Sequence, residues 1–517
     1  MKKTIFSRLA LVLAFALLLS AFTFSTAFAT KANDTLIYGI EGDPGNDLNT
    51  ISTSGRFDLM AERMLYSTLF NYFGPDDITY LLAESVETSA DLMTYTVKLR
   101  KDVKWSDGVP FTADDVVFTY SKIIEFPYAN GHAAFVYGDK NVEVVKIDDY
   151  TVEFRMPQLV NGFLEMLTNE HYMMPKHIYE GDATLDNNVK NQTPVGTGPY
   201  TLEEYKAGQY TKFKANPNYF LGAPKIGTII FQVVSDPSSA ALALKKGEIN
   251  ALVIANSAAE DYAGTPVTVY AYPEDRVGYM SFNLASSRVS DINLRKACFY
   301  ALNRTEMNIG AYVSEDFFVN AVSFLPYNAA FYTSEVEAYD TNLDTAKEYL
   351  AKVSDVPTLR LAYGSGNAQQ EVQAMVIQQN LKAIGVNVEI LAMDINALID
   401  KMENGSDEYE MFLGGYIMGV DPVNYSTLFT SDSSSNYAHM SDPELDQLFA
   451  DGAIATDTAA RAEIYKKAQQ RLADLAIFYP IVTNSRLLAM TSDVGGVEDA
   501  RLVPIYTFEN MGELYFN

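Results

Sequence analysis

The sequence predicts a soluble protein of the α/β class, built from about three domains. Its 517 residues exceed the roughly 100–200 residues of one domain. With 48% hydrophobic and 20% charged residues, the composition is that of a folded chain, since disordered chains are far less apolar. The third observation is a strand, helix and strand pattern between residues 359 and 391, the unit from which parallel sheets are built.

The first third of the chain predicts a strand, a capped helix and a hairpin. Apolar residues alternate with polar ones over residues 95–99, which favours a half-buried strand. Thr112 and Asp115 have the spacing of a capping box and predict a helix start. The inward face of that helix is predicted to hold Val116, Tyr120 and Ile123. A predicted hairpin pairs residues 142–147 with residues 150–154, and Asp107-Gly108 is predicted to form a turn.

Later segments predict more helices and a parallel strand pair. Cys298 falls at helical spacing with apolar neighbours, so we expect a core residue and not a reactive thiol. Strands are predicted over residues 359–362 and 386–391. The helix between them is expected to turn four residues inward and to end near Gly385; these are Val372, Met375, Val376 and Leu381. Such a connection predicts a right-handed crossover.

The N-terminal 29 residues have the order of a secretory signal. Three basic residues precede an apolar run from Leu9 to Leu19, and small residues lead to Ala27-Phe28-Ala29. The run is shorter than the ~20 residues of a membrane span. Phe22 stands where a lipoprotein signal has its lipid-bearing cysteine. We therefore expect an exported protein that begins at Thr30, periplasmic or at the cell surface, without a lipid anchor.

Charge and cysteine content exclude several classes of protein. The formal net charge is -28, and residues 1–29 contribute three positive charges and no negative one. Such a surface repels nucleic acids and anionic membranes. With Cys298 as its single cysteine, the chain has no intramolecular disulfide and no multi-cysteine metal site.

Catalytic and cofactor motifs do not appear. Gly196-Thr197-Gly198 lacks the spacing of a dinucleotide fingerprint and indicates a turn. Gly364-Ser365-Gly366 lacks the spacing of a nucleophile elbow. We expect no enzyme and no cofactor. A binding protein with a cleft between α/β lobes is the simplest interpretation, and the 34 tyrosines and 29 phenylalanines suit its walls.

A series of short motifs resembles bacterial extracellular solute-binding proteins of family 5, the peptide- and nickel-binding subunits of ABC importers. The motifs follow one another in the family's order: Trp105–Val116, Pro194–Tyr200, Asn216–Tyr219, Lys246–Ile249, Ser281–Asn283, Leu294–Ala297, Asp421-Pro422 and Leu445-Asp446. The resemblance runs from about Leu36 to the C-terminus.

The resemblance implies a two-lobed periplasmic-binding-protein-like fold of type II with an additional third domain. Lobe I would comprise residues 30–57, 193–279 and 494–517, the additional domain residues 58–192, and lobe II residues 280–493. The chain would cross between the lobes near residues 275–282 and near Asp493, and the lobes would close on the ligand by hinge bending. The implied partner is the transmembrane permease of an ABC transporter, served by a monomeric binding protein.

The resemblance also implies ligand-binding residues. Thr53, Ser54 and Gly55 correspond to a loop that lines the site in dipeptide-binding relatives, although they also suit a surface turn. Tyr363 begins a stretch that holds a carboxylate-binding Arg in those relatives, and that Arg is missing here. Tyr416 replaces a Trp of the cleft wall. Met418 stands where peptide binders have the Asp that holds the α-ammonium group, and a shift of the alignment would let Asp421 replace it.

Without these charged anchors, the cleft is not expected to close on a small zwitterion, because an unpaired buried charge is costly. The expected ligand is an oligopeptide held by backbone hydrogen bonds, whose affinity falls less than about tenfold on N-acetylation. A nickel or metal chelate and an oligosaccharide are the alternatives within the fold. A secreted hydrolase or an adhesin would be a protein of another class.

Overall fold

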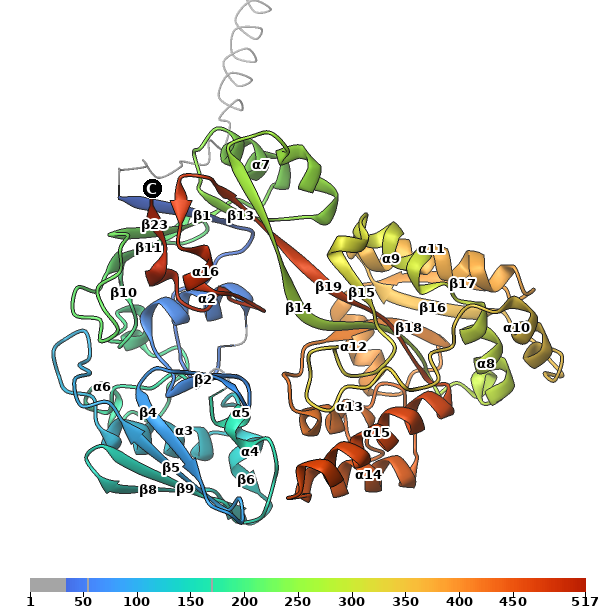
Figure 1. Cartoon of the computed structure of the whole chain (residues 1–517), viewed down its shortest axis with the longest axis horizontal. Helices are drawn as coiled ribbons and strands as arrows, with labels where there is room; N and C mark the ends of the chain where they lie inside the picture. The colour runs from blue at the N-terminus through green and yellow to red at the C-terminus, as the bar shows by residue number, and fades with distance from the viewer. Residues whose placement is uncertain (1–33, 54, 169–170) are drawn as a thin grey trace, which may run out of the picture.

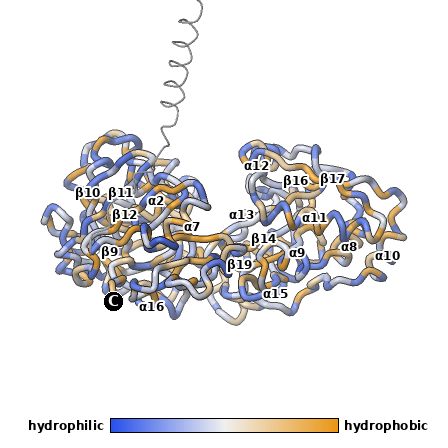
Figure 2. The backbone as a smooth tube through the Cα atoms, turned by 90° about the horizontal axis from the view of Figure 1, so that it is seen from above, coloured by the Kyte–Doolittle hydropathy of each residue, from blue (hydrophilic) through white to orange (hydrophobic). Residues whose placement is uncertain are grey.

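The computed structural model describes residues 34–53, 55–168 and 171–517, so the predicted signal segment, Thr30 and Ser54 lie outside the described residues. Two bodies stand side by side in Figure 1, joined by the long strands β14 (Val267–Phe282) and β19 (Phe478–Thr491). The view from above shows the same two strands between the bodies (Figure 2).

One mixed sheet of eleven strands runs through both bodies. In sheet order its strands are β10 (Tyr200–Lys206), β11 (Tyr210–Ala215), β12 (Thr228–Val233), β1 (Thr35–Ile40), β13 (Ala251–Ile254), β19, β14, β18 (Met411–Tyr416), β16 (Leu359–Gly364) and β17 (Val388–Met393), with β15 (Phe318–Asn320) paired to β19. The sheet is continuous because β14 and β19 pair with each other and also with strands of both bodies.

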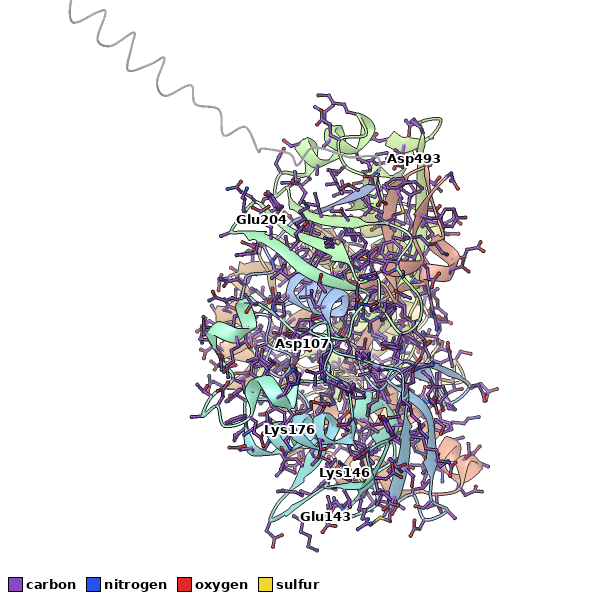
Figure 3. The ribbon with its side chains drawn as sticks, turned by 90° about the vertical axis from the view of Figure 1, so that its left-hand side faces the viewer. Asp107, Glu143, Lys146, Lys176, Glu204 and Asp493 are labelled. Atoms are coloured by element: carbon purple, nitrogen blue, oxygen red, sulfur yellow. The ribbon has the colours of Figure 1, made fainter. Side chains whose placement is uncertain are left out.

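The first body is built from two separate stretches of the chain, one that ends at the crossing strand β14 and one that begins in β19. Its hydrophobic clusters are formed by residues before Pro273 and after Arg486. Around the shared sheet lie α2 (Arg56–Leu65), α7 (Pro237–Lys245), η2 (Asn256–Tyr262), β20 (Val494–Gly495), α16 (Val497–Ala500), β21 (Leu502–Val503), β22 (Thr507–Phe508), η6 (Met511–Glu513) and β23 (Tyr515–Phe516). Figure 3 shows this body from its outer side, with Glu204 and Asp493 near one end and Glu143 and Lys146 near the other.

A separate antiparallel sheet forms the far end of the first body. Its order is β4 (Ala83–Thr88), β5 (Thr94–Leu99), β9 (Thr151–Arg155) and β8 (Glu143–Asp148). The other elements here are β2 (Phe70–Gly74), β3 (Asp77–Tyr80), α3 (Ala113–Glu125), α4 (His132–Phe135), β6 (Val136–Tyr137), β7 (Lys140–Asn141), α5 (Phe163–Thr168), α6 (Lys176–Tyr179) and η1 (Val189–Gln192). The predicted strand over 95–99 and the hairpin are therefore confirmed.

The predicted capping box of α3 is present. The Thr112 side chain accepts a hydrogen bond from the Asp114 amide, and the Asp115 carboxylate accepts one from the Thr112 amide at 3.0 Å. The predicted inward face, residues 116, 120 and 123, is buried. Gly196 and Gly198 have a different role from the predicted turn: a Cβ on either would overlap the backbone of Leu65. They allow two chain segments to touch.

The second body has one hydrophobic cluster, formed by residues between Val277 and Val482. Its helices are η3 (Ser287–Val289), α8 (Ile292–Ala301), α9 (Arg304–Tyr312), η4 (Glu315–Phe317), α10 (Leu343–Leu350), α11 (Ala368–Lys382), α12 (Ile395–Glu403), η5 (Pro422–Tyr425), α13 (Ser426–Phe429), α14 (Pro443–Ile454) and α15 (Thr458–Leu475). Cys298 is fully buried in α8, and burial raises the pKa of its thiol to about 12. The parallel pairing of β16 with β17 is confirmed.

The predicted inward face of α11 is wrong in part. Met375 is 53% exposed, and Val372 and Val376 are half-buried. The buried residues are Gln370, Gln373, Ala374, Ile377 and Leu381. Two faces of this helix have apolar residues at helical spacing. The face that packs inward is the one that also contains Gln370 and Gln373.

The chain crosses between the bodies where the β14–β19 ladder breaks. Pro273 pairs with Ser485 and Val277 with Thr483, so residues 274–276 of β14 stand outside that ladder. The first crossing overlaps the predicted range of 275–282. The second lies before the predicted Asp493, because Leu487 already pairs with β13 in the first body. The other predicted domain boundaries stay predictions.

Candidate ligand-binding site

A cavity of about 750 Å³ lies where the two bodies meet, and we call it the central cavity. Six parts of the chain contribute to its lining: residues 72–73, 130–137, 160–166 together with His171, 417–427 and 503–506, and Asp275 on β14. In Figure 1 these parts belong to α4, α5 and β6 on one side and to α13 on the other. The cavity is therefore built by both bodies and by a crossing strand.

The described walls of the central cavity are mainly apolar, and their charge is negative. Its carboxylates are Glu165 and Asp275, and no Lys or Arg lines it. His171 also lines it, but burial lowers the pKa of this imidazole to about 4, so the ring is neutral at pH 7. Apolar walls with a few polar groups are typical of sites for small ligands.

Glu165 joins the two bodies. From α5 of the first body its carboxylate accepts hydrogen bonds from the amides of Val420 at 2.8 Å and Asp421 at 3.0 Å, and from Asn424 Nδ2 at 3.1 Å. Gly419 has a φ of +76°, and a Cβ there would overlap the Glu165 carboxylate. Burial, with the charge of Asp421 adding to it, raises the pKa of Glu165 to about 7 despite these hydrogen bonds.

Asn161 makes a second contact between the bodies. Its amide nitrogen donates to the Ala453 carbonyl at 2.7 Å, and its Nδ2 donates to the carbonyls of Gly452 at 3.2 Å and Ala455 at 2.7 Å. These acceptors belong to the C-terminal end of α14 and the residue after it. Carbonyls at a helix end lack partners inside the helix, and Asn161 supplies donors to three of them, one of which, at Gly452, also accepts from Arg461 at 2.9 Å.

Asp275 is the other acid of the central cavity, and its carboxylate is sparsely bonded. It adopts a left-handed φ of +54° at the break in the ladder, a conformation that Asp tolerates better than most residues. It accepts one side-chain hydrogen bond, from Asn328 Nδ2 at 2.9 Å. Burial raises its pKa, and no cationic side chain within the described residues forms an ion pair with it. Asp275 thus has capacity to accept from a solute.

The second body contributes two of the predicted residues to the neighbourhood of the cavity. Met418 lines it. Asp421 is not among the lining residues, and its carboxylate is held by Arg461 at 2.6 and 3.0 Å. The structure therefore gives Asp421 a partner of its own, and its role as a substitute for the missing amino anchor stays a prediction.

The other predicted residues that the structure describes do not line the central cavity, although the Thr53 carbonyl accepts a hydrogen bond from Asn130, which does. Tyr416 donates its hydroxyl to the Phe324 carbonyl at 2.6 Å and packs against the second body's core. Tyr363 is buried in β16. Thr53 bonds to the Asn49 carbonyl, and Gly55 precedes α2. Ser54 is outside the described residues. Their role in ligand binding stays a prediction.

Sequence reasoning missed Glu165 and Asp275. Glu165 sits in a short helix without any motif. Asp275 stands between Glu274 and Arg276 in a strand whose other residues carry no charge, and this charged run was a signal that could have been used. Glu274 itself is bound by Arg56 and Arg486, both at 3.1 Å, so the fold decides which of the two acids remains unpaired.

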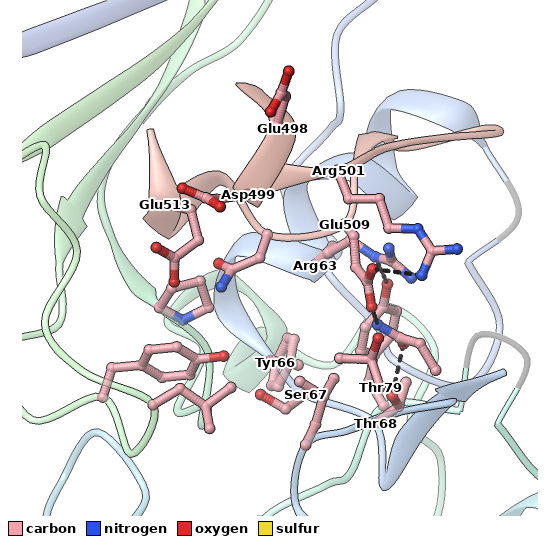
Figure 4. A pocket seen from close by; sticks show the side chains of 17 residues that line it. Arg63, Tyr66, Ser67, Thr68, Thr79, Glu498, Asp499, Arg501, Glu509 and Glu513 are labelled. Atoms are coloured by element: carbon pink, nitrogen blue, oxygen red, sulfur yellow. Dashed lines mark hydrogen bonds and ion pairs between the residues drawn. The ribbon is translucent and has the colours of Figure 1, made fainter. Parts of the chain in front are cut away.

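A second large cavity, of about 600 Å³, lies inside the first body, and we call it the internal cavity (Figure 4). Its buried carboxylate, Glu509, accepts a hydrogen bond from Asn71 at 2.9 Å and pairs with Arg501 at 3.5 Å. Arg501 also pairs with Asp77 at 2.6 Å, and Glu513 pairs with Lys225 at 3.0 Å. The second body contributes nothing to its walls.

Comparison with known proteins places this geometry in a family. Residues 77–437 match the sequence signature described as Bacterial extracellular solute-binding proteins, family 5 Middle. The chain belongs to this family. It is a solute-binding protein of ABC transporters and, like the rest of this non-catalytic family, not an enzyme.

Individual relatives agree over almost the whole chain. The oligopeptide-binding protein AppA of Bacillus subtilis (strain 168) is 27% identical over 522 residues, which covers 93% of this chain and 94% of AppA. The structure of the ABC transporter substrate-binding protein CtaP from Listeria monocytogenes is 36% identical, with a TM-score of 0.90, and covers 94% of this chain and 100% of its own. That of a putative peptide-binding protein AppA from Clostridium difficile is 32% identical, with a TM-score of 0.88, over 93% and 100%.

The predicted α/β fold of a two-lobed solute-binding protein is confirmed by this likeness. In the part of the chain that the structure describes, no helix has the length and hydrophobicity needed to cross a membrane.

Proposed function

We propose that this solute-binding protein captures an oligopeptide in the central cavity and delivers it to the transmembrane permease of an ABC importer. One observation carries the proposal: the cavity is mainly apolar, contains the sparsely bonded carboxylate of Asp275, and has no Lys or Arg among the described residues of its walls. A solute with a cationic amine and apolar side chains matches these walls, and a peptide has both.

The same charges argue against the other solutes. An anionic metal chelate would face two carboxylates without a cation, and an uncharged oligosaccharide would leave Asp275 without a counter-charge. A volume of about 750 Å³ falls within the roughly 300–1000 Å³ of ligand sites. The peptide-binding names of two similar proteins support the proposal.

Asp275 takes the role of amino anchor in this proposal. Asp421 is already bound to Arg461, and Met418 has no charge. Removing one partner of a desolvated charge pair typically lowers affinity roughly 30-fold or more. N-acetylation of the peptide should therefore have that effect, in contrast to the small effect expected from sequence alone.

The first experiment identifies the solute. Native mass spectrometry of the freshly purified chain from Thr30 onward is expected to show a retained peptide of more than two residues. The peptide should be recovered intact, since the family does not catalyse reactions. A retained sugar or metal chelate, or cleavage of the peptide, would overturn the proposal.

Calorimetric titration then tests the anchor with one such peptide in free and N-acetylated form. The wild type should lose roughly 30-fold in affinity on acetylation, and Asp275→Asn should bind both forms alike. Asp355→Asn, which changes an exposed acid of the second body, is the matched control and should behave as the wild type. Equal affinities of the wild type for both forms would exclude Asp275 as the anchor.

We also propose that the segment ending at Ala29 directs export and is then removed, leaving a monomer free of lipid. Lys2, Lys3 and Arg8 followed by the apolar run support this. The intact mass of the secreted protein should correspond to a chain starting at Thr30. A mass that includes residues 1–29 or a lipid would contradict it.

A further inference from the structure

Arg276 follows Asp275 on β14 but lines a different cavity. This cavity, which we call the strand-end cavity, measures about 360 Å³ and lies at the carboxyl ends of β16 and β18 in the second body. Ligands of open α/β sheets bind in crevices at this end of the strands. The linings of the two cavities share no residue, but they use neighbouring positions of the same chain segments: Asp275 and Ile417 line the central cavity, and Arg276 and Gly415 line the strand-end cavity.

Arg276 differs from every other arginine in the described residues, because it has neither a hydrogen bond nor an ion pair. The acids nearest in sequence are not bonded to it: Glu274 binds Arg56, Arg486 and Asn484, and Asp275 binds Asn328. The other arginines are bonded to carboxylates, carbonyls or, for Arg63, a tyrosine hydroxyl. The charge of Arg276 acts on Glu274 and Tyr279 without a hydrogen bond or an ion pair to either, so this half-buried guanidinium keeps its hydrogen-bond donors for a ligand.

The backbone makes room for this guanidinium. Its Cζ lies so close over Gly415 that a Cβ there would overlap it. Gly278, which pairs with Gly415 across the two strands, also lies beside Arg276. Two glycines at one ladder position thus allow the guanidinium to lie flat on the sheet at the mouth of the cavity.

The walls of the strand-end cavity suit an anion. Among the residues that the structure describes, Arg276 is the one charged residue that lines it, and no Asp or Glu does. Asn367 and Gln370 add amide groups, while Ile395, Leu398 and Met402 form an apolar side. The planar fork of a guanidinium binds a carboxylate through two parallel hydrogen bonds.

We propose that Arg276 binds the carboxylate of the solute in the strand-end cavity. The inference rests on the proposed function, and it assigns the peptide's C-terminal carboxylate to Arg276 while the ammonium lies in the central cavity. The arginine that is missing from the stretch after Tyr363 is thereby replaced by one from the crossing strand, which lines the same cavity as Gly364, Asn367 and Gln370.

The test compares one peptide as free acid and as C-terminal amide by calorimetric titration. The wild type should bind the amide roughly 30-fold more weakly, whereas Arg276→Met should bind both forms with the weaker affinity. Arg276→Lys should recover part of the difference, since it restores the charge but not the fork. Gly415→Ala should reproduce the loss by displacing the guanidinium. Arg288→Met, whose exposed side chain reaches Glu410 only at 3.8 Å, is the matched control.

The outcomes separate this inference from the proposed function. If the wild type binds acid and amide within threefold, Arg276 is not the anchor, even though peptide binding stands. If no peptide binds at all, the proposed function fails, and N-acetylalanine then tests the cavity alone by thermal shift. Stabilisation by millimolar N-acetylalanine that Arg276→Met abolishes would still support the anion site, and its absence would overturn it.

Discussion

The central cavity and the internal cavity have similar volumes, about 750 and 600 Å³, and both have carboxylates in their walls. They differ in how those charges are balanced. In the internal cavity, Glu509 and Glu513 have Arg501 and Lys225 as partners within the first body, while the two exposed acids at its rim, Glu498 and Asp499, form no ion pair among the described residues. In the central cavity, Asp275 has a single amide donor. The buried acid with an ion pair stabilises the folded state, whereas the carboxylate of Asp275, which has no ion pair among the described residues, can accept hydrogen bonds from a solute.

The cavities also differ in what would happen if the bodies moved. The internal cavity would keep its walls, because one body supplies all of them. The central cavity would open, because its walls come from both bodies and are linked through Glu165 and Asn161. A site that changes with the distance between bodies suits a protein that must take up and release its solute.

The largest expected effect tests the rule that paired charges serve folding. Arg461→Met removes the partner of Asp421, together with the hydrogen bond from Arg461 Nε to the Gly452 carbonyl and the cation–π contact with Phe331. Both side chains of the pair are largely buried, with 10% and 13% exposure. Removing one partner of a buried ion pair leaves the other charge unpaired and typically lowers the free energy of unfolding by about 3–5 kcal/mol. Urea denaturation should show a loss of this size in the free energy of unfolding.

The double variant Arg461→Met with Asp421→Asn serves as the control for this prediction, because it removes both charges. It should recover part of the stability lost in the single variant. A single-variant loss below about 1 kcal/mol, typical of exposed pairs, would mean that Asp421 is solvated and open to a ligand.

A smaller effect concerns pH and the contact between the bodies. The pKa of Glu165 is about 7 in this arrangement, and near 4.3 in water. At a pH between these two pKa values, Glu165 is protonated to a greater extent when the two bodies are in contact than when they are apart. The free energy of separating the bodies therefore falls as the pH rises from about 5 to 8. The radius of gyration from small-angle scattering should increase over this range.

Glu165→Gln is the control variant for the pH effect. This substitution should remove most of the pH dependence of the radius of gyration. We assign the pH dependence that remains to Asp275, whose pKa is also raised by burial. His171 does not contribute in this window, because its pKa is about 4. The same pH profile in wild type and variant would show that Glu165 does not control the contact.

Features set by neighbours in sequence could be predicted from the sequence. The capping box at Thr112 and Asp115 and the strand pair around α11 depend on short spacings, and both are present. The buried face of α11 could not be predicted in the same way. Its apolar residues offer two rows at helical spacing, and packing against the rest of the second body selects one.

The candidate site depends on contacts between distant residues, and this limited its prediction. Asp275 and Arg276 are two charges in a row on a strand, and only the fold shows that they face different cavities. Met418 was found because it occupies a motif position. Tyr363 and Tyr416, also motif positions, pack into the second body, since an aromatic residue at a strand end suits a core as well as a cleft wall.

The smallest expected effect tests the internal cavity. Glu509 has 8% side-chain exposure and pairs with Arg501, so it resembles a ligand-binding acid in burial but not in bonding. Glu509→Gln keeps an oxygen for Asn71, and Arg501 keeps Asp77, to which it donates at 2.6 and 2.9 Å. The free energy of unfolding should therefore fall by only about 1 kcal/mol.

For the same reason the affinity of Glu509→Gln for the peptide should stay within about twofold of the wild type, a free-energy difference of roughly 0.4 kcal/mol. Calorimetric titration of the peptide into Glu509→Gln and into Asp275→Asn compares one substitution in each cavity by the same measurement. A tenfold loss in Glu509→Gln would contradict the comparison, because it would show that a paired carboxylate in the first body still takes part in binding. An unchanged affinity in Glu509→Gln together with a reduced affinity in Asp275→Asn would show that solute binding depends on the carboxylate of Asp275. The acid of the internal cavity would then contribute to folding and not to binding.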